Sequence, residues 1–157
     1  MRQLALLLRD RRDQLYGQWL SSLKDTVGEE YRDVLESPLG ALTVRRFVED
    51  LASIAQAEAY EIPALERRIE QEWSADAGRR GALGFDLVDV IRGLQQLRAA
   101  IWKVMIDALV MGELPSFGET MDEMSLVDAF LDRLIQVEVR GFLVGQAAPR
   151  QSELDDD

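Results

Sequence analysis

Residues 81–102 read GALGFDLVDVIRGLQQLRAAIW, and this stretch contains the pattern that decides the fold. Its apolar side chains recur every three or four residues, as they do on one face of an α-helix. Asp86 stands just ahead of the pattern, where its carboxylate can cap a helix N-terminus. The spacing persists to Val110, so we expect one long helix over residues 86–110. Its core-facing stripe is predicted to be Leu87, Ile91, Leu94, Ile101, Met105 and Leu109.

A second stripe on the same helix comprises Val88, Gln95, Ala99, Trp102, Ile106 and Val110. Since both stripes cannot face solvent, we expect the second one to pack against another helix or a second subunit. A glycine inside a helix, as at Gly93, costs about 1 kcal/mol relative to alanine, and a close helix crossing would offset that cost. The alternative is that Gly93 is merely tolerated. The candidate dimer or helix-crossing surface is therefore Gly93, Gln95, Ala99, Trp102 and Ile106.

Outward from this helix, four prolines divide the chain at points where helical patterns stop. We expect further helices over about residues 3–24, 39–60, 63–73 and 119–144, with a short one between residues 25 and 37. The segment SADAGRRGALG, residues 74–84, is expected to be a glycine-containing loop. No segment alternates with period two, so no sheet is expected. The prediction is an all-α bundle of about five to six helices, with one domain at 1–147 and an acidic tail or linker start at 148–157.

The composition excludes most catalytic chemistry. The chain has 157 residues, 47% of them hydrophobic, which is enough to form a hydrophobic core without disulfides or metal ions. It contains no histidine and no cysteine, so it has no Ser-His-Asp or Cys-His nucleophile system. The same absence removes the usual zinc ligands, the Glu-x-x-His pairs of di-iron bundles and the usual axial ligands of haem. We therefore expect no enzymatic activity, no metal and no cofactor.

Carboxylates remain the only plentiful chemical groups. Glu66 with Glu70, and Asp128 with Asp132, each stand four residues apart on a helical face. Such a pair can share a proton or bind a hard cation. The alternative is a solvated face whose charge is screened by neighbouring arginines, here Arg67, Arg68 and Arg133.

The charge distribution bears on partners and location. The net charge is −11, and two modestly basic stretches, residues 1–24 and 77–103, alternate with two more acidic ones. Nucleic-acid binders present a concentrated basic face, so we expect no nucleic-acid partner, and an anionic membrane is disfavoured for the same reason. The apolar run from Leu4 to Leu8 is too short for a signal segment or a membrane span. We expect a cytoplasmic protein.

Large aromatic side chains lie near the ends of several helical stripes. The three tryptophans are Trp19, Trp73 and Trp102. Side chains of this size usually fill a core, but together with other apolar residues they can also line a ligand cavity. The residues that would line such an apolar pocket are Tyr16, Trp19, Phe47, Trp73 and Met105.

Four segments carry a family resemblance: RRDQLYGQWLSSL at 11–23, ALTVRRFVEDLASI at 41–54, RRGALGFDL at 79–87 and VIRGLQQLRAAIWKVM at 90–105. Across residues 4–144 the chain resembles the N-terminal sensor domain of RsbR-type proteins, the RsbT co-antagonist family of bacterial stress signalling. The resemblance implies a globin-like fold that binds no haem. It also implies a homodimer that passes a signal to a C-terminal output domain or to a signalling partner.

Two functions remain open from the sequence. The first is a non-haem, globin-like sensory or interaction domain that relays a signal by helix repacking in a homodimer. The alternative is a helical effector-binding domain with a small apolar ligand pocket.

Overall fold

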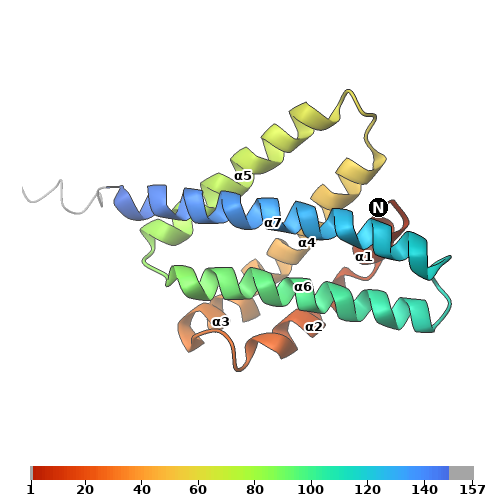
Figure 1. Cartoon of the computed structure of the whole chain (residues 1–157). Coiled ribbons are helices and arrows are strands. Elements are labelled where there is room, and N and C mark those ends of the chain that lie inside the picture. The colour runs from red at the N-terminus through yellow and green to blue at the C-terminus, as the bar shows by residue number, and fades with distance from the viewer. Residues whose placement is uncertain (1, 149–157) are drawn as a thin grey trace, which may run out of the picture.

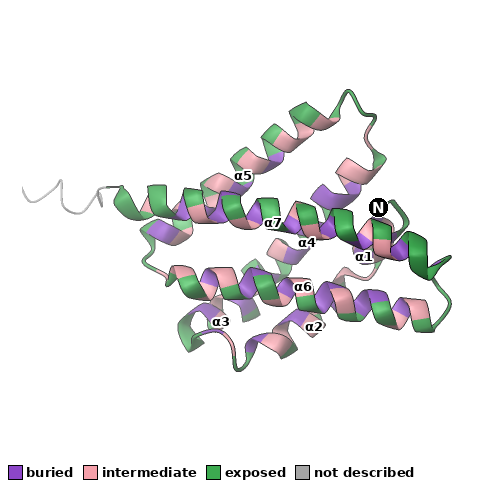
Figure 2. Cartoon of the chain, in the orientation of Figure 1, coloured by how far each residue is buried: buried purple, intermediate pink, exposed green. Residues whose placement is uncertain are grey.

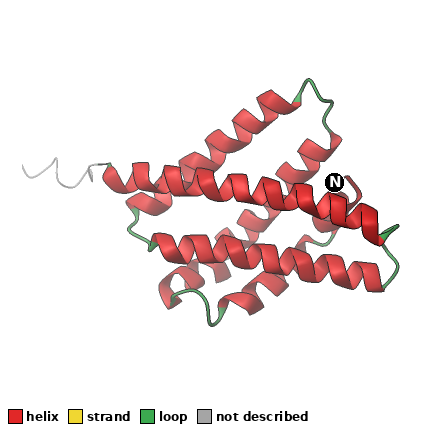
Figure 3. Ribbon diagram, viewed as in Figure 1, coloured by secondary structure: helices red, strands yellow, loops and turns green. Residues whose placement is uncertain are grey.

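The computed structural model describes residues 2–148, and these residues form α-helices and connecting turns with no strand (Figure 3). The all-α prediction is confirmed. The described helices are α1 (Arg2–Asp10), α2 (Arg12–Leu23), α3 (Glu29–Glu36), α4 (Pro38–Gln56), α5 (Ile62–Ala82), α6 (Leu87–Val110) and α7 (Phe117–Ala147).

The two longest helices set the frame of the molecule (Figure 1). Helices α6 and α7 lie side by side and run in opposite directions, while α5 crosses α7 near its C-terminal end. Helix α2 packs against α6, and α4 contacts α1, α2, α3 and α5. Within residues 2–148 no helix is both long and apolar enough to cross a membrane.

The core lies between α6 and the helices around it, and Figure 2 shows the buried faces turned inward. The buried face of α6 is Val90, Gly93, Leu94, Leu97, Ala100, Ile101, Val104, Met105 and Ala108. Three members of the predicted core stripe belong to this face, whereas Leu87, Ile91 and Leu109 at its edge are only half-buried. The side chains of Trp19, Phe47 and Phe142 fill the largest volumes between the helices.

Polar side chains cap several helix starts, and one of these caps, Asp86, was predicted from the sequence. Asp86 accepts a hydrogen bond from the Val88 backbone N–H at 2.9 Å, which confirms the predicted start of α6. Ser37 caps α4 in the same way, and Pro38 occupies the first turn, where its missing N–H costs nothing. The backbone N–H groups of Gln3 and Leu4 donate to the Glu123 carboxylate of α7, which ties the start of α1 to α7.

The prediction of one helix over residues 3–24 is wrong. The chain bends at Arg11, whose φ of −108° and ψ of 26° separate α1 from α2. The two pieces differ in their main neighbours, since α1 packs mostly on α4 and α7, whereas α2 packs mostly on α6 and less on α4. Because of this bend, residues 2–148 form seven helices instead of the predicted five or six.

The expected loop over residues 74–84 is also wrong, because α5 continues through it to Ala82. Its glycines are contact positions: a Cβ on Gly81 would collide with the Phe142 carbonyl oxygen of α7. Likewise a Cβ on Gly141 would come within 2.6 Å of the Ser74 carbonyl oxygen. Glycine here allows two helix backbones to touch. The C-terminal part of α5 is therefore helical because of this packing and not because of the helix propensity of its residues.

Smaller differences occur at other helix ends. Helix α4 ends at Gln56 instead of near Tyr60, and α7 extends the predicted range at both ends. The predicted acidic tail, residues 148–157, lies outside the described residues except for Ala148, which follows the last turn of α7.

Candidate functional site

A cleft of about 400 Å³ lies where α2, α3, α4, α5 and α6 converge. Its lining is mainly apolar and aromatic with five charged residues, one of which, Glu138, comes from α7. Leu39, Leu42 and Leu83 at its mouth are more than half exposed. An apolar cavity with a few convergent polar groups is the usual form of a small-molecule site.

Two tryptophans, Trp19 and Trp73, line the cleft, and both indole N–H groups have partners inside the protein. Trp19 donates to the Gly93 carbonyl oxygen at 2.7 Å. Trp73 donates to the Asp50 carboxylate at 2.9 Å. Because both donors are satisfied, these side chains offer an occupant of the cleft only their apolar ring surfaces.

Gly93 faces the side chains of Tyr31 and Leu35 of α3. A Cβ at this position would come within 3.3 Å of the Tyr31 ring, and its carbonyl holds the Trp19 indole. The small size of Gly93 therefore leaves room for the Tyr31 side chain of α3, and its carbonyl binds Trp19 of α2. Gly93 is a helix-crossing position within the chain.

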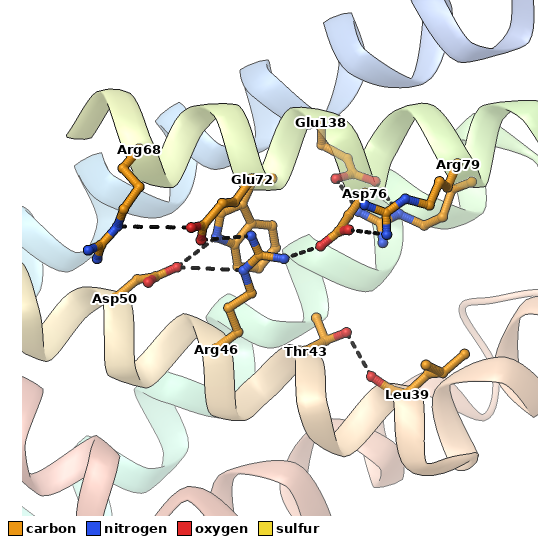
Figure 4. A network of polar contacts seen from close by, with 11 residues as sticks. Leu39, Thr43, Arg46, Asp50, Arg68, Glu72, Asp76, Arg79 and Glu138 are labelled. Carbon is orange, nitrogen blue, oxygen red and sulfur yellow. Dashed lines mark hydrogen bonds and ion pairs between the residues drawn. The ribbon is translucent and has the colours of Figure 1, made fainter. Parts of the chain in front are cut away.

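Arg46 organises a network of charged side chains between α4 and α5 (Figure 4). Its guanidinium bonds the Asp76 carboxylate, lies 3.1 Å from Glu72 and 4.0 Å from Asp50, and sits over the Trp73 ring at 5.4 Å from the ring centroid. Burial raises the pKa of Asp50, although the Trp73 hydrogen bond and the Arg46 charge both act to lower it. The network holds α4 against α5 along one side of the cleft.

A second ion pair joins α5 to α7 at the bottom of the cleft. The Nε and Nη2 atoms of Arg80 each donate to a Glu138 carboxylate oxygen at 2.6 Å, and Glu138 is only 1% exposed. Burial alone would lower the pKa of Arg80, but the hydrogen bonds and the charge of Glu138 raise it. Such a two-pronged pair fixes geometry as well as charge.

Tyr31 is a polar lining residue whose hydroxyl has no hydrogen-bond partner among the described residues. It is 7% exposed and packs on Phe85, with ring centroids 5.5 Å apart. Within residues 2–148 its hydroxyl makes no protein hydrogen bond, in contrast to Tyr16, which donates to the Leu35 carbonyl at 2.7 Å. Burial raises the pKa of Tyr31 to about 12, and the nearby charge of Arg80 opposes that rise.

The structure separates the predicted pocket residues. Trp19 and Trp73 line the cleft. Phe47 and Met105 are fully buried in the core, and Tyr16 borders a neighbouring, more polar pocket near Pro38.

The predicted dimer or helix-crossing surface also divides. Gln95, Ala99 and Ile106 are exposed on the outer side of α6, and Trp102 is half-buried beside them. Gly93 alone faces inward. The outer side of α6 therefore keeps an exposed apolar stripe in the single chain.

Three important residues of the cleft were missed in the sequence. The sequence predicted a loop at Arg80 and a short helix around Tyr31, and neither residue was a candidate for a binding site. Glu138 did carry a signal, because an acidic residue stood on the apolar face of the last helix, four residues after Leu134. A charged group in such a position usually has a buried partner.

The paired carboxylates lie beside arginines; Asp132 is exposed, whereas Glu66, Glu70 and Asp128 are half-buried. Arg133 bonds Glu70 and lies 3.9 Å from Glu66. Arg98 bonds Asp132 and lies 3.7 Å from Asp128. Within the described residues, no group of three or more acidic side chains is placed to hold a metal ion.

Compared with protein-family models, with curated proteins and with solved structures, the chain matches none of them. The resemblance to RsbR-type sensor domains therefore stays a prediction, and the function has to be argued from the cleft.

Proposed function

We propose that this chain is a sensory domain without enzymatic activity, in which occupation of the cleft alters the packing of α7. The observation that carries the proposal is Glu138, a residue of α7 whose carboxylate lies at the bottom of the cleft and is held by Arg80. An occupant of the cleft would act on this ion pair directly. It would thereby bias the longest helix of the molecule.

The contact between α5 and α7 supports such a relay. The two helices run in the same direction, with Gly78 beside Gly145 and Ser74 beside Gly141. Because the backbones touch, a shift of α5 cannot be absorbed by side chains and must move α7 or break the contact. Arg80 lies between Gly78 and Gly81 of this crossing, and Glu138 lies one turn before Gly141.

The resemblance of the sequence supplies the wider role in this proposal. It implies a globin-like, non-haem module of bacterial stress signalling, and the chain has no histidine to hold haem. In this proposal α7 passes the signal to an output domain or a partner protein in the cytoplasm.

The proposal includes a homodimer. Support comes from the outer stripe of α6, where Val88 is 51%, Ile106 is 47% and Val110 is 79% exposed around the small side chain of Ala99. An apolar stripe of this kind is typical of a surface that pairs with a second copy.

The cleft also favours the alternative function, a helical effector-binding domain. The two functions share the ligand site and differ in the relay, because the alternative needs neither a dimer nor a change in α7. Measurements on α7 therefore distinguish them.

The relay is tested by filling the cleft without a ligand. Val34 lines the cleft from α3 and is half-buried, so Val34→Trp serves as a surrogate occupant. We expect amide hydrogen exchange of α7 around Glu138 to change at least about threefold, a free-energy difference of roughly 0.7 kcal/mol. Tyr60→Trp is the control, because Tyr60 is 82% exposed in the turn between α4 and α5 and lies outside both the cleft and the stripe of α6. A folded Val34→Trp protein with the same α7 exchange as the control would contradict the relay.

A further inference from the structure

We infer that the occupant of the cleft is a neutral, largely apolar molecule with a single hydrogen-bonding group, which binds the hydroxyl of Tyr31. This inference rests on the proposed function, since it names the chemical class that the same cleft would take. The argument comes from which polar groups of the cleft already have partners and which one does not.

The cations inside the cleft are committed to protein carboxylates. Arg80 gives two hydrogen bonds to Glu138, and Arg46 bonds Asp76 and Glu72. An anionic ligand that took either guanidinium would leave a carboxylate without its partner. For Glu138, which is 1% exposed, that means an uncompensated buried charge, which is strongly unfavourable.

The third cation among the described lining residues is Arg79, and it lies at the mouth of the cleft. Arg79 contacts Asp76 at 3.0 Å, but its side chain is 72% exposed at the mouth. An ion pair formed there would stay in water, where such pairs contribute little. The mouth therefore gives an anion no substantial advantage over a neutral molecule.

The neutral polar groups of the walls are committed as well, with one exception. Thr43 donates to the Leu39 carbonyl at 2.9 Å, and the indoles of Trp19 and Trp73 are also bonded. Among the described lining residues, Tyr31 is the polar side chain that has neither a hydrogen bond nor an ion pair.

Tyr31 is suited to form a hydrogen bond with one polar group of a ligand. The residue is more than nine-tenths buried, its ring is fixed between Phe85 and the space over Gly93, and its phenol stays neutral at ordinary pH. A neutral phenol can donate and accept one hydrogen bond each. The surrounding side chains of Leu35, Leu83 and Phe85 provide apolar surface for the rest of the molecule.

A matched pair of dyes tests the charge of the ligand. N-phenylnaphthylamine is neutral with one N–H group, and anilinonaphthalene sulfonate has the same ring skeleton with a permanent negative charge. In fluorescence titrations of the full chain we expect the neutral dye to bind at least about tenfold more tightly, a difference of 1.4 kcal/mol. Equal or tighter binding of the sulfonate would overturn the inference.

A matched pair of tyrosines tests the position. Tyr31→Phe should weaken binding of the neutral dye by about threefold to tenfold, the range of one net hydrogen bond. Tyr60→Phe should leave binding unchanged, because Tyr60 is 82% exposed between α4 and α5. Binding that Tyr31→Phe leaves unchanged would also overturn the inference.

The outcomes separate this inference from the proposed function. Tight sulfonate binding that Val34→Trp abolishes would overturn the neutral ligand and keep the cleft as the binding site. Binding of neither dye would overturn the inference, while the exchange of α7 in Val34→Trp would still decide the relay by itself.

Discussion

Among single residues, Tyr31 combines burial with a hydroxyl that has no hydrogen-bond partner in residues 2–148. Its phenol lies over Gly93, so the small residue that interrupts the α6 pattern makes room for a side chain from another helix. The residue pattern of α6 indicated that Gly93, an unfavourable residue inside a helix, has a packing role. That role depends on α3, a helix with only a weak sequence signal, and so could not be predicted from α6 alone.

The Tyr31 phenol gives a pH prediction. A pKa raised from 10.0 to about 12 means that the folded state favours the neutral phenol. Its contribution to stability is therefore fully present below pH 10 and is lost as the pH rises from 10 to about 12. Above that range we expect the wild type to lose roughly 2–3 kcal/mol of unfolding free energy relative to Tyr31→Phe.

Urea unfolding of both proteins at several alkaline pH values measures this difference. Ultraviolet titration of the wild type should show one phenol near pH 12 that is missing in Tyr31→Phe. Parallel loss of stability in both proteins would contradict the assignment of the buried, neutral phenol to Tyr31.

At the scale of elements, the crossing of α5 and α7 is the feature that local sequence patterns misjudged. Two glycines and two arginines in residues 78–81 indicated a loop, because glycine is a poor helix former. The side of α5 that carries the two glycines instead lies against Gly141 and Gly145 of α7, some sixty residues away in the chain. In contrast, α6 was predicted to its correct ends, because its cap and its apolar period are both local.

The crossing predicts opposite effects for two glycine substitutions. Gly81→Ala places a Cβ against the Phe142 carbonyl oxygen, and we expect it to lower the unfolding free energy by about 3 kcal/mol. Gly17 is exposed on α2, and a Cβ added there meets nothing within 4 Å. Gly17→Ala should therefore raise the unfolding free energy by up to about 1 kcal/mol. Chemical unfolding compares the two, and similar effects would argue against backbone contact at the crossing.

The ion pair between α5 and α7 gives a second prediction at this scale. Arg80→Met leaves the buried Glu138 charge unpaired, and we expect a loss of about 3–5 kcal/mol. Replacing both residues, as Arg80→Met with Glu138→Leu, should recover most of that loss, because no buried charge remains. A double variant as unstable as the single one would contradict the direct coupling seen in the 2.6 Å contacts.

For the whole molecule, the sequence predicted the class of fold and the exclusion of histidine and cysteine chemistry, both of which depend on composition and period. The cleft was only half predicted: Trp19 and Trp73 line it, whereas Phe47 and Met105 fill the core. An aromatic residue at helical spacing looks the same in a core and in a cavity wall. Only the arrangement of several helices distinguishes the two.

The outer stripe of α6 makes a prediction about assembly. Ala99→Arg puts a charge into the stripe, and we expect it to weaken the proposed dimer at least about tenfold, or 1.4 kcal/mol. Ala75→Arg is the matched control, since Ala75 is an exposed alanine within α5. Light scattering over a concentration series measures both, and a wild type that stays monomeric throughout would contradict the dimer.

The relay from the cleft to α7 is tested most directly by hydrogen exchange in two backgrounds. Val34→Trp fills the cleft, once with the Arg80–Glu138 pair intact and once in the Arg80→Met, Glu138→Leu background. We predict that filling changes the exchange of α7 around position 138 in the first background and leaves it unchanged in the second. An equal change in both backgrounds, or none in the first, would contradict a signal that passes from the cleft through this ion pair.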